Sequence, residues 1–123
     1  MPEKSILVIS CDPYLAGLYG RKFENDGWEV MIAENFKEAD ILIAKNQPNI
    51  ALIQKECSTD IVSEVIRIKS MPSAQKMKIV ILAKDADLKE VQASRNAGAS
   101  DYLLIGHFVA HEAVEKMREL LNK

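Results

Sequence analysis

Residues 48–57, "PNIALIQKEC", contain an apolar run with sharp polar boundaries. Pro48 and Asn49 favour a turn, and the four residues that follow them are all apolar. A strand that is buried on both faces of a parallel sheet shows no polar alternation, so this run predicts a central strand over 50–54. Binding and catalytic groups of α/β proteins usually lie at the carboxyl ends of such strands, which makes Gln54 the first candidate site residue.

Four more apolar runs and five helical patterns extend this arrangement along the chain. The runs predict strands over 5–10, 28–33, 79–83 and 101–105. Strict alternation of strands and helices with short loops predicts one α/β domain over residues 1–123, a parallel sheet with helices on both faces. Ten elements in this length suit the flavodoxin-like (βα)5 fold with strand order 2-1-3-4-5.

Capping residues and apolar periodicity mark the helices. Asp12 followed by Pro13 predicts the start of the first helix. The caps expected for the next three helices are Asn35, then Ser58 or Thr59, then Asp85 or Asp87. The buried positions expected are Ile61, Val62, Val65 and Ile66 in the third helix, and Ala113, Val114, Met117, Leu120 and Leu121 in the fifth.

The predicted strand order brings the carboxyl ends of the first and third strands together. In this fold class ligands bind at that topological switch point. The residues expected around the crevice are Ser10, Cys11, Asp12 and Gln54, with Ala83 and Ile105 at its rim.

Composition argues against several classes of partner. The 123 residues are 48% hydrophobic and 28% charged, which predicts a folded protein. The formal net charge is −2 and no basic cluster is present, so we expect no nucleic acid partner. No apolar run is long enough for a membrane span or a secretory signal. Cys11 and Cys57 form neither a disulfide framework nor a CxxC pair, which predicts free thiols in a cytoplasmic protein.

Five ordered segments carry a resemblance to a known family. They are "ILVISCDP" at the first strand and helix, "DGWEV" before the second strand, "QPNIALI", "KIVILAK" and "NAGASDYLL". The most specific is the last, in which a Gly98 turn is followed by Asp101, Tyr102 and an apolar strand. Over residues 5–121 the chain resembles the receiver domain of bacterial two-component response regulators.

The resemblance implies a phosphorylation site that this chain has lost. In active receivers an aspartate at the end of the third strand accepts a phosphoryl group from a histidine kinase. Two carboxylates after the first strand hold Mg²⁺, while a hydroxyl ends the fourth strand and a lysine ends the fifth. The matching positions are Gln54 for the acceptor, Ser10 and Cys11 for the carboxylates, Ala83 for the hydroxyl and Ile105 for the lysine. We therefore expect a degenerate pseudo-receiver that is not an enzyme and holds no metal or cofactor.

The resemblance also implies a class of partner. Output in this family leaves through the face formed by the fourth helix, the fifth strand and the fifth helix, where Tyr102 matches the aromatic switch position. The expected function is a protein-interaction module whose partner is a histidine kinase or another signalling protein. Because Ala83 leaves space beneath the ring, we expect Tyr102 to lie inward. The alternative is an outward ring with its hydroxyl in water.

Two other functions stay open. Asp12 could be an unconventional phosphoacceptor or a displaced metal ligand, against its simpler interpretation as an N-cap. Cys11 and Cys57 could form a redox pair, or a soft-metal site with His107, and the crevice would then belong to a small-molecule or redox sensor.

The remaining polar residues near the strand ends give no further site. Lys55, Lys84 and His111 are expected on a solvated surface. The chain has no GxGxxG motif, no P-loop and no nucleophile elbow, so nothing in it points to an enzyme.

Overall fold

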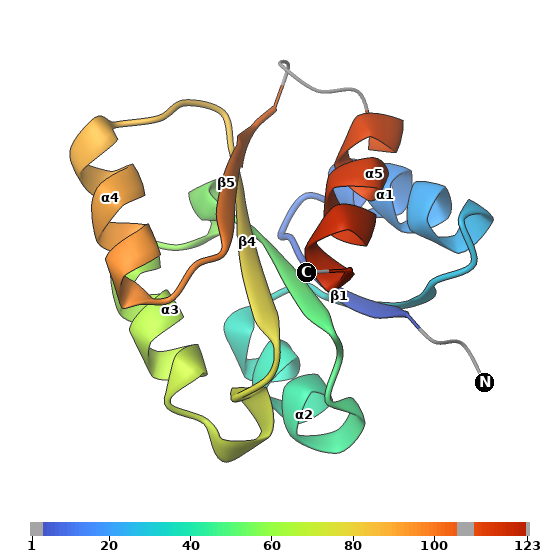
Figure 1. Ribbon diagram of the computed structural model, residues 1–123, viewed down its shortest axis with the longest axis horizontal. Coiled ribbons are helices and arrows are strands. Elements are labelled where there is room, and N and C mark those ends of the chain that lie inside the picture. The colour runs from blue at the N-terminus through green and yellow to red at the C-terminus, as the bar shows by residue number, and fades with distance from the viewer. Residues whose placement is uncertain (1–3, 106–109, 123) are drawn as a thin grey trace.

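Five parallel strands form one sheet, in the order β2-β1-β3-β4-β5, in the computed structural model (Figure 1). The structure describes residues 4–105 and 110–122. The strands are β1 (Ser5–Ile9), β2 (Glu29–Ala33), β3 (Ile50–Gln54), β4 (Lys78–Ala83) and β5 (Asp101–Leu104). The predicted flavodoxin-like order is confirmed, and each predicted strand end is correct to within one residue.

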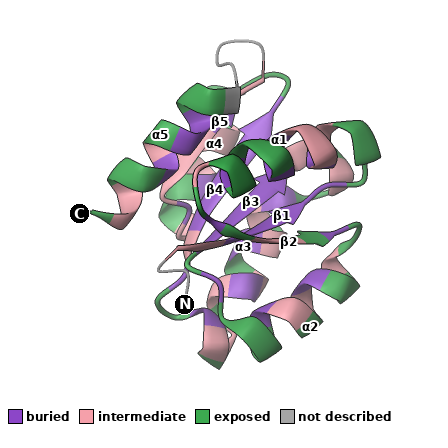
Figure 2. Cartoon of the chain, turned by 90° about the vertical axis from the view of Figure 1, so that its right-hand side faces the viewer, coloured by how far each residue is buried: buried purple, intermediate pink, exposed green. Residues whose placement is uncertain are grey.

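Helices cover both faces of the sheet. One face carries α1 (Pro13–Asn25) and α5 (Ala110–Leu121), and the other carries α2 (Phe36–Asn46), α3 (Ile61–Lys69) and α4 (Leu88–Ala97) (Figure 1). Successive strand residues point to opposite faces. Leu52 therefore belongs to the apolar cluster under α1 and α5, and Ile53 to the cluster under α2 and α3. Figure 2 shows the buried central strands between helices whose outer sides are exposed.

Three of the predicted N-caps are confirmed. Asp12 accepts the N–H of Tyr14 at 3.0 Å, and Pro13 is the first residue of α1. Asn35 caps α2 and Asp87 caps α4, so Asp85, the alternative for α4, is not the cap. Each of these side chains pairs a backbone N–H that has no partner within its helix.

The predicted start of α3 is wrong. A short 3₁₀ helix, η1 (Lys55–Cys57), follows β3, and Asp60 caps α3 by accepting the N–H of Ser63 at 3.1 Å. Ser58, one of the two predicted caps, instead accepts the N–H of Asp60 at 3.1 Å. Ser and Asp both suit a cap, so propensity alone does not separate them.

One predicted core residue of α3 is exposed. Ile61, Val65 and Ile68 form the buried stripe, whereas Ile66 is 55% exposed. Residues in an α-helix turn by about 100° each, so a stripe of i, i+4 and i+7 leaves the position after Val65 pointing outward. The face predicted for α5 is confirmed, with Ala113, Val114 and Met117 buried and Leu120 and Leu121 half-buried.

Asp26 and Trp28, which follow α1, connect α1 with α5 through polar and aromatic contacts. Trp28 is buried, packs edge-to-face on Phe23 with 5.1 Å between ring centroids, and donates its indole N–H to Asp26 at 3.0 Å. Arg118 of α5 donates to both carboxylate oxygens of Asp26, at 2.9 and 3.0 Å. These contacts join α1, the loop between α1 and β2, and α5. The hydrogen bond from Arg118 is the main cause that lowers the pKa of Asp26.

None of the helices in the described part of the chain has the length and apolar character needed to cross a membrane.

Candidate functional site

The carboxyl ends of β1 and β3 meet at the switch point through two neutral side chains. Ser10 directly follows β1 and Gln54 ends β3, and they are only 3% and 5% exposed. The Ser10 hydroxyl donates to Gln54 Oε1 at 2.6 Å and accepts the N–H of Asp12 at 3.1 Å. The serine and the amide oxygen thus satisfy each other inside the fold, as buried polar groups must.

Asp12 lies beside this pair but faces outward. It is exposed, and its Oδ1 accepts the N–H groups of Tyr14 at 3.0 Å and Leu15 at 3.4 Å. Its interpretation as the cap of α1 is confirmed. The capping bonds commit one carboxylate oxygen to the helix, which leaves the other for any further role.

The two cysteines do not stay free, so the prediction of free thiols is wrong. Cys11 and Cys57 form a disulfide with 5.7 Å between their Cα atoms. They are 46 residues apart in the sequence, and their spacing matches no motif. They meet because Cys11 follows β1 and Cys57 lies in η1 after β3, and these strands are neighbours in the sheet.

The disulfide lies against the neutral pair. Cys57 Sγ accepts the N–H of Cys11 at 2.9 Å and lies 3.4 Å from Gln54 Oε1. A disulfide sulfur carries no proton, so this second approach is a contact and not a hydrogen bond. His107, the third member of the soft-metal alternative, lies outside the described residues.

The rim of the crevice is apolar, as its residue types imply. Ala83 is fully buried at the end of β4, and its carbonyl oxygen accepts the N–H of Ile105 at 2.7 Å. The Ile105 side chain is partly buried against the cluster under α1 and α5. Ala83 and Ile105 are therefore adjacent at the tips of β4 and β5, and neither offers a polar side chain to the crevice.

A charged network, which the sequence did not reveal, links η1 to α4 and β5. Lys55 pairs with Glu90 at 2.7 Å and with Asp85 at 3.4 Å. The Tyr102 hydroxyl donates to the same oxygen of Glu90 at 3.1 Å. The hydrogen bond to Glu90 raises the pKa of Lys55, and burial raises the pKa of Tyr102 to about 12.

Tyr102 is neither fully inward, as predicted, nor outward with its hydroxyl in water, as in the alternative. Its ring packs partly against the cluster that contains Ile81 and Ala99, but the residue is not completely buried. Its hydroxyl is held by Glu90 of α4 rather than by water. Glu90 has no motif around it, and only the fold brings it to Tyr102.

Lys84 and His111 are exposed, as expected. The backbone N–H of Lys84 donates to Glu56 Oε2 at 3.0 Å, which joins η1 to the loop before α4. Within residues 4–105 and 110–122, no three acidic, histidine or cysteine side chains gather in a way that could hold a metal ion.

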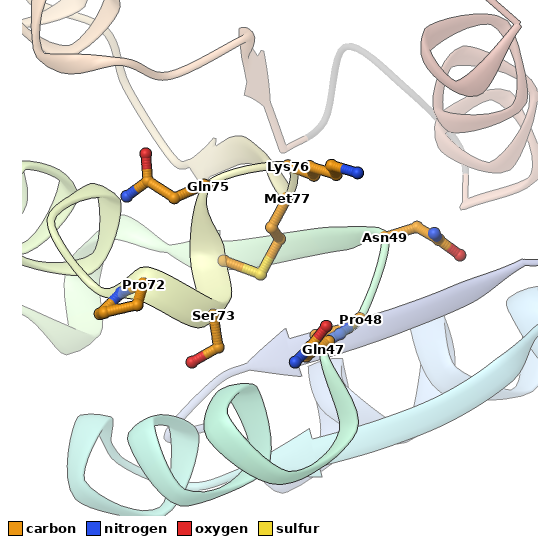
Figure 3. Close-up of a pocket in the computed structure, with 8 residues that line it drawn as sticks. All are labelled: Gln47, Pro48, Asn49, Pro72, Ser73, Gln75, Lys76 and Met77. Carbon is orange, nitrogen blue, oxygen red and sulfur yellow. The ribbon is translucent and has the colours of Figure 1, made fainter.

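A pocket of about 390 Å³ opens at the opposite edge of the sheet (Figure 3). It lies where β3 and β4 begin, between the segments 47–49 and 72–77. Lys76 is its one charged lining residue, and the others are neutral. No residue of the predicted crevice takes part in it.

Solved structures of response regulators and of receiver domains superpose closely on this chain. A response regulator from Thermotoga maritima superposes with a TM-score of 0.87 at 19% identity, covering 98% of each chain. A CheY-like receiver domain protein from Methanospirillum hungatei JF-1 gives 0.86 at 24% identity, covering 97% of this chain and 94% of the other. The chain has a receiver fold. A signal receiver domain of a DNA-binding response regulator from Colwellia psychrerythraea 34H gives 0.86 at 20% identity, covering 98% of this chain and all of that one.

The likeness lies in structure and not in sequence. No protein-family model matches the sequence, and no curated protein is significantly similar to it.

Proposed function

We propose that this chain is a pseudo-receiver, a cytoplasmic single-domain signalling module that binds a protein partner without being phosphorylated. The observation that carries the proposal is the buried hydrogen bond between Ser10 and Gln54. Where the resemblance expects carboxylates around Mg²⁺, two neutral side chains are hydrogen-bonded to each other. An amide cannot act as the nucleophile that accepts a phosphoryl group.

The rest of the crevice supports the same conclusion. Mg²⁺ takes oxygen ligands and prefers carboxylates, but the second position of the acidic pair is Cys11, held in a disulfide. Ala83 has no hydroxyl to bond a phosphoryl oxygen. Ile105 has no charge to neutralise one, so a dianion at this site would lie against apolar groups at a high cost in desolvation.

Phosphorylation is tested by incubating the protein with Mg²⁺ and acetyl phosphate and then measuring its intact mass, with an active receiver as the positive control. We expect no gain in mass. A gain that survives in the Asp12→Asn variant would refute the proposal outright. A gain abolished by Asp12→Asn would establish the rival function, a receiver with Asp12 as its unconventional acceptor.

We place the partner, a histidine kinase or another signalling protein, on the face formed by α4, β5 and α5. Leu88, the first residue of α4, is 85% exposed there, and Tyr102 lies on β5 with its hydroxyl held by Glu90. Burial of this apolar side chain against a partner would favour binding. Nothing in the composition suggests nucleic acid, a membrane or a cofactor as part of this interaction.

The face is tested by capture of partners from the native cell with matched variants. Leu88→Glu places a charge on the proposed face, and Ile41→Glu places the same charge on α2, where Ile41 is 61% exposed. We expect Leu88→Glu to lose the partner that the wild type and Ile41→Glu both capture. Equal capture by the two variants would refute the proposed face.

A further inference from the structure

Each residue of η1 binds a different part of the molecule. Cys57 is bonded to Cys11 in the loop after β1. Glu56 accepts the N–H of Lys84 in the loop before α4. Lys55 pairs with Glu90 of α4. This three-residue segment therefore connects the switch point with the α4 side of the molecule.

We propose that Cys11 and Cys57 form a reversible thiol–disulfide couple, and that η1 relays the state of this couple to α4 and β5. The redox state of the couple would then be the input that replaces phosphate. The couple itself is independent of the proposed function, whereas the relay ends on the face where that function places the partner.

The proposed chemistry is thiol–disulfide exchange with a low-molecular-weight disulfide such as oxidised glutathione. The Cys11 thiolate attacks one glutathione sulfur, forms a mixed disulfide and releases a glutathione thiolate. The Cys57 thiolate then attacks Cys11 Sγ and releases the second one. The two protein sulfurs lose two electrons to glutathione, and their two protons end on two glutathione thiols. Excess glutathione reverses both steps.

Two observations favour exchange over a permanently closed bond. Cys11 is an exposed residue and Cys57 a half-buried one, so a small thiolate has access to the Cys11 sulfur. Attack there expels the Cys57 sulfur, which accepts the N–H of Cys11 at 2.9 Å, and a donated N–H favours the charge that develops on a leaving thiolate. In the cytoplasm, where we place this protein, disulfides are mostly transient and redox-sensing.

Reduction changes the contacts on both sides of Cys57. It removes the covalent tie between η1 and the loop after β1. It also gives Cys57 a proton, and its sulfur lies 3.4 Å from Gln54 Oε1, which now accepts from Ser10. A thiol donor would compete with Ser10 for that oxygen. Lys55 lies two residues away on the same short segment, so its pairing with Glu90, and through Glu90 the Tyr102 hydroxyl, responds to the change.

The couple is tested with the unmodified protein equilibrated in glutathione buffers of different ratios, followed by alkylation and mass measurement. We expect the doubly alkylated form to dominate under excess reduced glutathione and to disappear under excess oxidised glutathione, in either order of addition. Cysteines that stay in one state at both extremes would overturn the couple.

The relay is tested by amide NMR of the two states. We expect shift changes at Lys55, Glu90 and Tyr102 as well as beside the two cysteines. Lys55→Gln should keep the exchange with glutathione and lose the change at Tyr102, whereas the matched control Lys84→Gln should keep both. Changes confined to the neighbours of Cys11 and Cys57, or a Tyr102 response that survives in Lys55→Gln, would overturn the relay.

These experiments stand apart from the phosphodonor test. A protein that gains a phosphoryl group refutes the pseudo-receiver while the alkylation result is unaffected. A protein that gains none, but whose cysteines do not exchange, keeps the proposed function and loses this inference.

Discussion

Gln54→Asp introduces, at the end of β3, the residue that the proposed function expects of an active receiver, and we expect it to destabilise the protein without making it phosphorylatable. The replaced amide is 5% exposed and accepts one hydrogen bond, from Ser10 at 2.6 Å. A carboxylate in its place has one neutral donor nearby, the Ser10 hydroxyl, and the disulfide sulfur of Cys57 donates nothing. The tip of β5 offers no compensating cation, because the resemblance expects a lysine there and the residue is Ile105.

The size of the loss follows from desolvation of the new charge. Full burial raises the pKa of a carboxyl by up to about 3–5, and one hydroxyl donor offsets part of this effect. We therefore take a folded-state pKa of about 6–7 for the new Asp, against about 3.9 in the unfolded chain. Each step of one in pKa corresponds to about 1.4 kcal/mol, so the expected loss in the free energy of unfolding is about 3–4 kcal/mol above pH 7.

The sign of the pH dependence separates desolvation of the new carboxylate from the effect of the shortened side chain. A raised pKa in the folded state penalises the charged form, so the penalty is absent below about pH 4, grows as the pH rises and is constant above the folded-state pKa. Urea unfolding of Gln54→Asp and Gln54→Asn between pH 4 and pH 8 measures it. The Asn variant has the same shortened side chain without the charge.

Two results would refute this reasoning. A difference between the Asp and Asn variants that does not grow with pH would show that the site is not desolvated. Labelling of Gln54→Asp by acetyl phosphate and Mg²⁺ would show that the remaining crevice is functional and that its losses were misinterpreted.

Three further predictions concern other parts of the molecule. Millimolar Mg²⁺ should leave the amide NMR shifts of Asp12 and Gln54 unchanged, and a saturable local shift would reveal a metal site. Reduction of the disulfide, which closes a loop of 46 residues, should lower the free energy of unfolding by up to about 4 kcal/mol in urea titrations, with a Cys11→Ser, Cys57→Ser variant insensitive to reductant. Asp26→Asn should lower the free energy of unfolding by about 1 kcal/mol at neutral pH and leave it unchanged in acid. Folding lowers the pKa of Asp26, so its carboxylate stabilises the protein above the unfolded-state pKa. That contribution is lost as the pH falls through the folded-state pKa. Equal unfolding curves for the Asp26 variant and the wild type at neutral pH would contradict it.

The sequence predicts the fold well because local and long-range signals agree in this chain. The apolar run before Gln54 is too short for a helix and too continuous for a half-exposed strand, so one interpretation remains. Asp12 and Asn35 each stand at a helix start where their side chain pairs a free N–H, and both caps were predicted. Regular alternation then leaves few topologies, because crossover connections between parallel strands are right-handed.

The contacts of the site depend on distances that the sequence does not contain. The third helix begins after η1, and a 3₁₀ turn has no strong sequence signal, so the prediction of Ser58 or Thr59 as its cap was wrong and Asp60 is the cap. The topology already placed Cys11 and Cys57 near the same strand ends, but bonding requires Cα atoms within about 7 Å, which spacing alone does not give. Glu90 was missed for the same reason, since an acidic residue in the first turn of a helix usually needs no explanation beyond the helix dipole.

Trp28 gives the molecule an optical probe that sees only one of its two layers. It is the single tryptophan of the chain, and it is buried in the cluster under α1 and α5. The cluster under α2 and α3 contains none. Fluorescence therefore follows the loss of the first layer, while circular dichroism follows helices on both faces. Superimposable melting curves from the two signals would mean that the central sheet makes both layers unfold as one cooperative unit, and displaced curves would identify which layer opens first.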